Sequence, residues 1–155
     1  MKAKILIVGI PGTGKTEIGN ILGQEKQYLH IDLEEQQNLN SLSQHPNRFI
    51  KQLINNHRDT VVTWGFLPDN TCIDIVLAFR NQGFKVIWFD GDRLAARKAF
   101  NLRATVSEQL FDLQLERIDH SDVISRISPI VYNTFDNEGK FKEHSKIIED
   151  LILLI

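Results

Sequence analysis

A run near the start of the chain, GIPGTGKT at residues 9–16, matches the pattern G-x-x-x-x-G-K-[ST] without a mismatch. It directly follows an apolar run at residues 5–8 that is typical of a buried strand. In this pattern the glycines let the backbone wrap closely around an anion, and backbone N–H groups and the N-terminus of the next helix face it. Lys15 adds a positive charge, and Thr16 offers a hydroxyl of the kind that binds Mg²⁺. The run therefore predicts a phosphate-binding loop between a strand and a helix.

The loop also predicts which residues hold a nucleotide. A chain of this length matches the bare pattern by accident on the order of one time in a hundred, so a glycine-rich turn that binds nothing is a weak alternative. The expected ligands are ATP, held by the loop backbone and Lys15, and Mg²⁺, held by the Thr16 hydroxyl. The nucleotide-binding residues of this motif are Gly9, Pro11, Gly12, Thr13, Gly14, Lys15 and Thr16.

The length of 155 residues suits one domain that covers residues 1–155. Hydrophobic residues make up 42% of the chain and charged residues 25%, which is typical of a folded globular protein rather than a disordered one. The formal net charge is −2, and no segment concentrates Lys and Arg into the stripe that a nucleic-acid backbone requires. Nucleic acid is therefore not an expected partner.

Cysteine content and hydropathy indicate a cytoplasmic protein. The single cysteine, Cys72, excludes an intramolecular disulfide and suits a reducing compartment. Its apolar neighbours predict a buried side chain rather than a nucleophile. The longest apolar runs, such as residues 151–155, are far too short to span a bilayer, and the phosphate loop occupies the place of a secretory leader. We therefore expect no membrane partner.

Strand-like and helix-like segments alternate along the chain. Beyond the strand at residues 5–8, apolar runs predict strands at residues 28–31, 60–64, 86–89 and 129–132. Helical periodicity separates them, from a helix at residues 14–23 on the phosphate loop to a closing helix around residues 147–152. This alternation predicts an α/β protein with the three-layer P-loop NTPase fold, in which a five-stranded parallel sheet has helices on both faces.

A polar segment follows the second predicted strand. Residues 34–45 are rich in Gln, Asn and Ser with scattered leucines, which predicts a mobile loop or a loosely held helix. Pro46 then begins an amphipathic helix whose apolar positions are Phe49, Ile50, Leu53 and Ile54. We expect this part of the chain, near residues 33–57, to cover the substrate.

Helix signals also occur in the second half of the chain. Gly83 is expected to end one helix. Further helices are expected to begin at Asp92 and at Thr105, where Thr105 and Glu108 have the spacing of a capping box. The inner stripe expected for the helix before Gly83 is Cys72, Ile75, Val76 and Phe79.

In this order the motifs resemble the small kinases that include adenylate, shikimate and gluconate kinases. The resemblance rests on residues 9–16, on Asp32 after the second strand, on the sequence at 65–68 after the third, and on the arginine-bearing segment at 92–103. It extends over nearly the whole chain, although only the first motif is highly specific. The resemblance implies ATP-dependent phosphoryl transfer to a small molecule, such as a nucleotide, a nucleoside or a shikimate-like acceptor.

The chain departs from this family after the third strand. Nucleoside monophosphate kinases have an Asp-Gly-Phe-Pro-Arg-like sequence there, whereas Trp64 replaces the acid here and no arginine follows. Asp32 is then the candidate carboxylate for the acceptor or the metal, as the resemblance to shikimate and gluconate kinases implies; alternatively it caps the end of its strand. Asp90 is a rival metal ligand, although Asp90-Gly91-Asp92 favours a turn.

The arginines after the fourth strand resemble those of the family's lid. A transferring phosphoryl group spreads negative charge over its oxygens, and cations on a mobile cover stabilise that charge while excluding water. Arg97 and Arg103 are the candidates, on a short lid near residues 97–106. The alternative is that these arginines form the solvated face of a helix.

The remaining candidates follow the third and fifth strands. Trp64, Gly65 and Phe66 lie where open α/β sheets bind ligands, so they are candidates for the acceptor wall, although aromatic rings there are often part of the core. Asn133 and Thr134 lie where the family's loop packs beside adenine. None of the five histidines has metal-ligand spacing.

Two other classes of phosphate-loop protein are alternatives to a kinase. A GTPase needs a guanine-reading Asn-Lys-x-Asp and an Asp-x-x-Gly after the third strand, and neither is present there. A non-catalytic or weakly hydrolytic nucleotide-binding module stays open because the usual acid is missing. The favoured reading is a Mg²⁺- and ATP-dependent kinase, monomeric or homodimeric, with Lys15, Asp32, Arg97 and Arg103 as catalytic residues.

Overall fold

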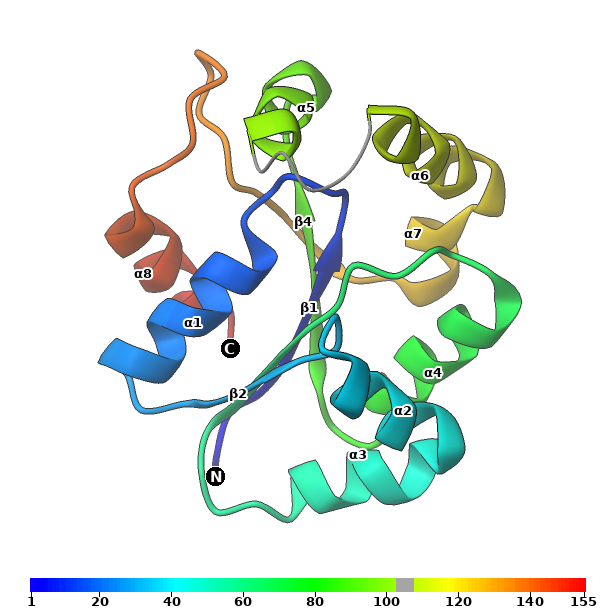
Figure 1. Cartoon of the computed structure of the whole chain (residues 1–155). Helices are drawn as coiled ribbons and strands as arrows, with labels where there is room; N and C mark the ends of the chain where they lie inside the picture. Colours follow the sequence, from blue (N-terminus) through cyan, green and yellow to red (C-terminus); the bar gives the residue numbers. More distant parts are fainter. Residues whose placement is uncertain (103–107) are drawn as a thin grey trace.

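The computed structural model describes residues 1–102 and 108–155, and within them five strands form one sheet (Figure 1). The strands are β1 (Lys4–Gly9), β2 (Leu29–Asp32), β3 (Thr60–Thr63), β4 (Lys85–Asp90) and β5 (Ile130–Asn133). Their order is β2-β3-β1-β4-β5, and every neighbouring pair is parallel. The predicted five-stranded parallel sheet is confirmed.

Helices cover both faces of this sheet. They are α1 (Lys15–Glu25), α2 (Gln36–Gln44), α3 (Pro46–Ile54), α4 (Asn70–Asn81), α5 (Arg93–Leu102), α6 (Glu108–Ser121), α7 (Val123–Ile127) and α8 (His144–Leu154). Within the described residues no helix combines the length and apolar character needed to cross a membrane.

The alternation of side chains along β1 explains the layers. Ile5 and Ile7 are buried against α1 and α8, whereas Leu6 and Val8 are buried in the cluster that α2 to α7 form on the other face. Successive side chains of a strand point to opposite faces, so an uninterrupted apolar strand requires cover on both sides. Because β1 is the central strand, the loop that follows it lies in the middle of the sheet's carboxyl edge.

The inner stripe of α4 differs from the prediction by a rotation of the helix. Ile73, Val76 and Phe79 are fully buried, whereas Cys72 and Ile75 are only half-buried. Asp69 caps the helix by accepting a hydrogen bond from the Cys72 backbone N–H at 2.7 Å. Burial, together with Asp69, raises the pKa of the Cys72 thiol to about 12, so the side chain is an inert thiol rather than a nucleophile.

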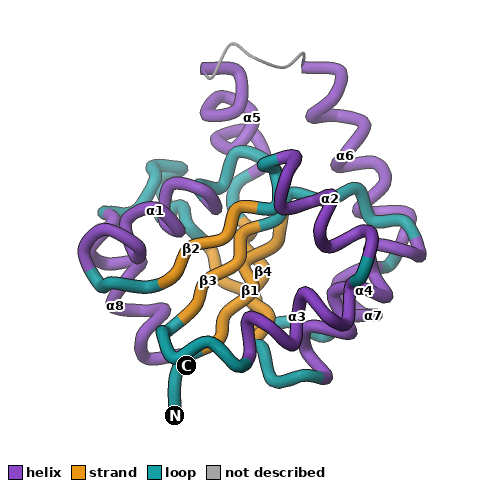
Figure 2. The backbone as a smooth tube through the Cα atoms, turned by 60° about the horizontal axis from the view of Figure 1, so that its bottom comes forward, coloured by secondary structure: helices purple, strands orange, loops and turns teal. Residues whose placement is uncertain are grey.

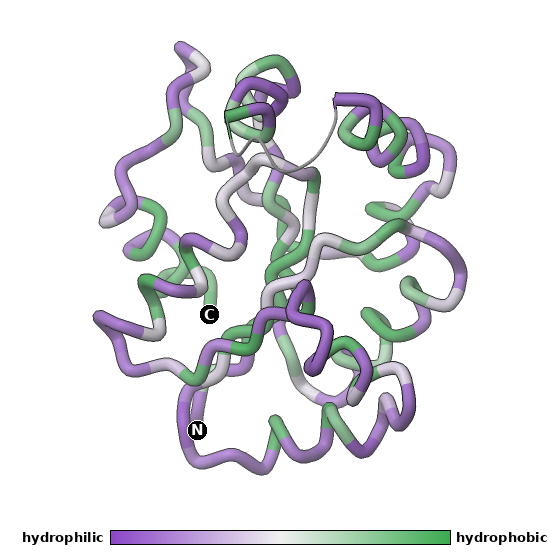
Figure 3. The backbone as a smooth tube through the Cα atoms, in the orientation of Figure 1, coloured by the Kyte–Doolittle hydropathy of each residue, from purple (hydrophilic) through white to green (hydrophobic). Residues whose placement is uncertain are grey.

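The polar segment after β2 is a helix, so the helical alternative of the prediction is the correct one. In α2 only Leu42 is fully buried, and most of the remaining side chains are exposed or hydrophilic (Figure 3). His45 ends α2, and Pro46 begins α3 in the next position, as expected for proline in a first helical turn. Helix α2 therefore lies at the surface with a single fully buried side chain, whereas α3 buries Ile50 and Leu53.

Helices α5 and α6 are neighbours that project beyond the sheet (Figure 2). Asp92 begins α5, since its carboxylate accepts the Ala95 N–H at 2.9 Å, which supports the turn-forming role predicted for this segment. The predicted helix start at Thr105 lies outside the described residues; the described helix begins at Glu108.

Candidate functional site

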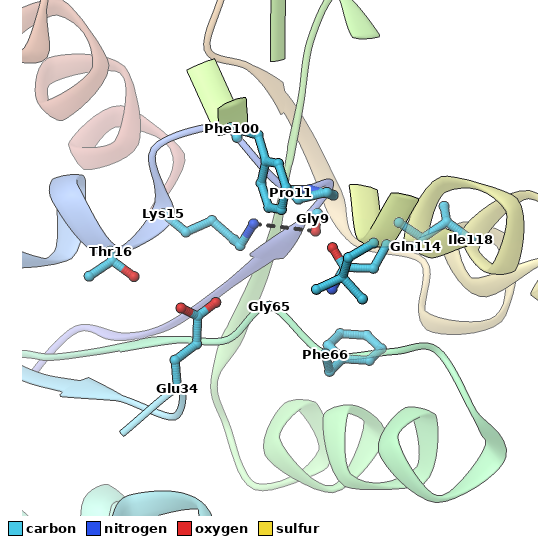
Figure 4. A pocket seen from close by; sticks show the side chains of 12 residues that line it. Gly9, Pro11, Lys15, Thr16, Glu34, Gly65, Phe66, Phe100, Gln114 and Ile118 are labelled. Carbon is cyan, nitrogen blue, oxygen red and sulfur yellow. Dashed lines mark hydrogen bonds between the residues drawn. The ribbon is translucent and has the colours of Figure 1, made fainter. Parts of the chain in front are cut away.

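A cavity of about 210 Å³ lies at the carboxyl edge of the sheet, next to the loop that follows β1 (Figure 4). One side of it comes from this loop and the first turn of α1, and the other side comes from the segments that follow β2 and β3 and from the α5–α6 pair. Its lining residues are Gly9, Pro11, Gly12, Lys15, Thr16, Glu34, Gly65, Phe66, Phe100, Leu110, Gln114 and Ile118.

The loop after β1 has a backbone that requires glycine. Gly12 has φ +77°, and a Cβ on it would stand 2.1 Å from the carbonyl oxygen of Ala96 in α5. The Thr13 hydroxyl is fully buried and donates a hydrogen bond to the Ile10 carbonyl oxygen at 2.8 Å. Thr13 thus holds the loop closed with its side chain, which leaves its backbone to serve a ligand.

Lys15 and Thr16 are the first two residues of α1 and directly follow the loop. Lys15 is 7% exposed, and its Nζ donates to the carbonyl oxygens of Ile10 at 2.8 Å and Gly9 at 3.4 Å. Thr16 is half-buried and lines the same cavity. A buried cation and a helix N-terminus that face one cavity make an environment suited to phosphate.

Glu34 lines the cavity and was not among the predicted site residues. A Cβ on Gly65 would stand 2.5 Å from Glu34 Oε1 and 3.7 Å from Lys15 Cε, so the carboxylate and the lysine stem flank the same point (Figure 4). The available signal was a second acid two residues after Asp32, beyond the end of β2.

Asp32, the predicted carboxylate, does not line the cavity. It ends β2 half-buried, and its Oδ1 accepts the backbone N–H of Glu34 at 3.0 Å. This is the strand-end turn that the sequence analysis gave as the alternative. A direct contact between Asp32 and an acceptor stays a prediction.

The segment after β3 divides between cavity and core. Gly65 and Phe66 line the cavity, whereas Trp64 is 5% exposed, packs on Phe66 with ring centroids 4.9 Å apart, and is not a lining residue. Trp64 is therefore a core residue in contact with the Phe66 ring.

The arginine Arg97 lies on α5 and faces α6 rather than the cavity. Its guanidinium is 3.0 Å from the Asp112 carboxylate and 3.5 Å from that of Glu108. Arg103, the other lid candidate, lies outside the described residues. Helix α6 instead contributes lining side chains that were not predicted: Leu110, Gln114 and Ile118.

Asn133 and Thr134 do not join this cavity either. The backbone N–H of Thr134 donates to Asp90 O at 3.1 Å, and its carbonyl oxygen accepts the Lys142 N–H at 2.8 Å. The Asn133 side chain accepts the N–H of Phe135 at 2.9 Å. These bonds shape the loop after β5, and the predicted contact with adenine stays a prediction.

Solved structures with this architecture include a shikimate kinase from Bacteroides thetaiotaomicron, with a TM-score of 0.64, 13% identity, and coverage of 98% of this chain and 97% of the kinase. A gluconokinase from Sinorhizobium meliloti has a TM-score of 0.56 and 14% identity, and the match covers 98% of this chain and 97% of the gluconokinase. The YorR protein of Bacillus subtilis, solved with phosphorylated GDP, has a TM-score of 0.65 and 15% identity, and the match covers 97% of this chain and 95% of YorR. The chain has the fold of the P-loop small-molecule kinases. No family model and no curated protein matches the sequence.

The P-loop kinase fold implies Mg²⁺ with the nucleotide, and the cavity's oxygen atoms are compatible with it. No group of three His, Cys, Asp or Glu side chains in the described ranges could hold a metal alone. Mg²⁺ is typically held by one or two protein oxygens together with substrate phosphates, and the Thr16 hydroxyl, which lines the cavity, can supply one of these. The two ring nitrogens of His30 form hydrogen bonds with the side chains of Asn20 and Thr63, and burial lowers the pKa of the imidazole.

Proposed function

We propose that the protein transfers the γ-phosphoryl group of ATP to a small molecule. The observation that carries this proposal is a single cavity with the phosphate loop on one side and a separate wall, including Glu34, Phe66 and Gln114, on the other. A protein that only binds nucleotide has no need for a second wall facing the phosphates, whereas a kinase needs a place for the acceptor there.

On the donor side, we assign the γ-phosphate end to Lys15 and the loop N–H groups, and the metal to Thr16. The buried lysine would neutralise charge on the phosphates, and the loop amides would hold them in one orientation. Magnesium held by Thr16 would supply positive charge against the negative charge that develops on the transferring phosphoryl group. The adenine contact of Asn133 and Thr134 belongs to this proposal as well.

On the acceptor side, we assign Glu34 to the hydroxyl of the acceptor. A carboxylate next to the phosphate end can accept a hydroxyl proton and orient the oxygen toward phosphorus. Asp32 then acts as a positioning residue, because its hydrogen bond to the Glu34 N–H fixes the turn that carries Glu34. In the same proposal the chain forms a single domain over residues 1–155. Residues 33–57 cover the acceptor, and residues 97–106 form the lid.

A release assay for ADP tests the proposal. With Mg-ATP we expect ADP formation that depends on an added acceptor from a panel of nucleoside monophosphates, nucleosides, shikimate, sugars and sugar acids. ADP formed at the same rate without any acceptor would instead identify a hydrolytic module, which the absence of an acid at Trp64 favours as the second candidate. Binding of ATP with no turnover would identify a non-catalytic module.

Arg97 provides a test of the lid. In this proposal Arg97 leaves Asp112 for the moving phosphoryl group when the lid closes, so in the Arg97→Ala variant we expect kcat to fall by on the order of 100-fold while the KM for ATP changes little. The matched control is Asp112→Asn, which breaks the ion pair at 3.0 Å but keeps the arginine. Equal losses of kcat in both variants would show that Arg97 only holds α5 to α6.

A further inference from the structure

The described lining residues on the acceptor side of the cavity include a negative side chain and no positive one. We define the acceptor wall as the lining residues outside the phosphate loop, α1 and α5: Glu34, Gly65, Phe66, Leu110, Gln114 and Ile118. This wall carries one carboxylate, one amide and three apolar side chains, and none of its side chains is a lysine or an arginine.

Lys15 carries the one positive charge among the described residues that line the cavity, and it belongs to the phosphate side. Its Nζ lies against the carbonyl oxygens of Gly9 and Ile10, at the base of the loop. During transfer that charge would face the phosphates of ATP. An acceptor with its own carboxylate or phosphate would therefore place a third negative group between the donor phosphates and Glu34, and no lysine or arginine of the described acceptor wall would lie beside it.

The arginines Arg93 and Arg97 of α5 form ion pairs with carboxylates of α6. Arg93 forms two hydrogen bonds with the Asp119 carboxylate, at 2.7 and 2.8 Å, and Arg97 pairs with Asp112. Arg117 of α6 is exposed and does not line the cavity. Among the described residues, Arg93 and Arg97 are thus paired with α6 carboxylates, and Arg117 is exposed to solvent.

We infer that the acceptor is a neutral or cationic alcohol with an apolar portion, and not a carboxylate or a phosphomonoester. The inference rests on the proposed kinase function. The Phe66 ring, Leu110 and Ile118 suit a ring or hydrocarbon portion, while the Gln114 amide can both donate and accept a hydrogen bond to a polar substituent. Glu34 attracts a cationic substituent and repels an anionic one.

The transfer balances with this acceptor. The hydroxyl oxygen forms a bond to the γ-phosphorus, the bond from that phosphorus to the β,γ-bridging oxygen breaks, and ADP leaves with the bond's electron pair. The hydroxyl proton passes to the Glu34 carboxylate and then to water. The products are ADP, a phosphate monoester and one proton.

Matched pairs of acceptors test the inference. The probes are shikimate and methyl shikimate, gluconate and gluconamide, AMP and adenosine, and glucose and glucosamine, each with Mg-ATP in the ADP-release assay and each titrated into the ADP complex by calorimetry. In each of the first three pairs that reacts or binds, we expect the uncharged member to have a kcat/KM or an affinity at least about tenfold higher, and in the last pair we expect the cationic glucosamine to be preferred. A preference for the carboxylate or phosphate member would overturn the inference and leave the kinase proposal standing.

Failure of the kinase proposal gives a different result. If ATP stabilises the protein but none of the probes binds or releases ADP, the acceptor wall holds no acceptor, and the proposed function falls together with the inference.

Two variants distinguish the effect of the Glu34 carboxylate from the effect of the protein's net charge. Glu34→Gln is expected to reduce the preference for the neutral or cationic member by about tenfold, because it removes the repelling carboxylate from the cavity. Glu35→Gln changes the net charge by the same amount in the next residue, which does not line the cavity, and is expected to leave the preference unchanged. An equal change in both variants would assign the preference to the overall charge of the surface and would contradict the role of the wall.

Discussion

Replacing Lys15 with alanine is expected to remove nearly all stabilisation of the protein by Mg-ATP. At an ATP concentration 100-fold above the wild-type Kd, binding stabilises the folded state by about 2.7 kcal/mol, and a 100-fold weaker Kd leaves about 0.4 kcal/mol. A loss of this size is reasonable because Lys15 is buried in the cavity and is its one lining cation within the described part of the chain. Thermal unfolding with and without Mg-ATP measures it, and kcat is expected to fall by at least about 100-fold.

The control for Lys15→Ala must separate ligand binding from folding. Lys15 also donates to the Ile10 carbonyl oxygen, so the variant's near-ultraviolet circular dichroism, which reports the buried Trp64 and Trp88, should match that of the wild type. Lys51→Ala removes an exposed lysine of α3 and should keep the full response to Mg-ATP. An unchanged response in Lys15→Ala would remove the basis for the phosphate site.

The Gly12→Ala variant is expected to be damaged in both stability and nucleotide binding. A left-handed backbone costs about 1–2 kcal/mol for alanine, and the new Cβ would lie 2.1 Å from the Ala96 carbonyl oxygen, so either the loop or α5 must move. We expect the free energy of unfolding to fall by about 2 kcal/mol or more and the affinity for ATP to fall at least tenfold. Urea unfolding and calorimetric titration measure the two effects.

Gly23 provides the matched control for Gly12. It lies within α1, and a Cβ there would make ordinary contacts at 3.5 Å with His30 and 3.7 Å with Tyr28. Gly23→Ala is expected to stabilise the protein by about 0.4–1 kcal/mol, because alanine has less conformational freedom to lose in a helix. If the two variants behaved alike, the close packing of α5 on the loop would not constrain the site.

Features that depend on neighbouring residues could be predicted from the sequence. The phosphate loop is a local motif in which glycines permit the turn and Lys15 follows at a set spacing, so its place between β1 and α1 was predictable. The alternation of strands and helices predicted the parallel sheet for the same reason, since the apolar run of β1 needs cover on both faces. The rotation of α4 was not predictable, because Cys72, Ile73 and Ile75 are all apolar and only the packing of the helix in the core decides which of them is buried.

The sequence by itself determined that the chain carries a phosphate loop on an α/β sheet and placed acidic and basic residues in the segments that surround it. Only the tertiary structure decided which of them face the cavity: Glu34 lines it while Asp32 holds the turn, and Arg97 meets Asp112. It also brought α6 to the acceptor wall. The physical reason is that a loop motif is set by contacts a few residues apart, whereas the direction of an exposed charged side chain depends on which distant element packs beside it.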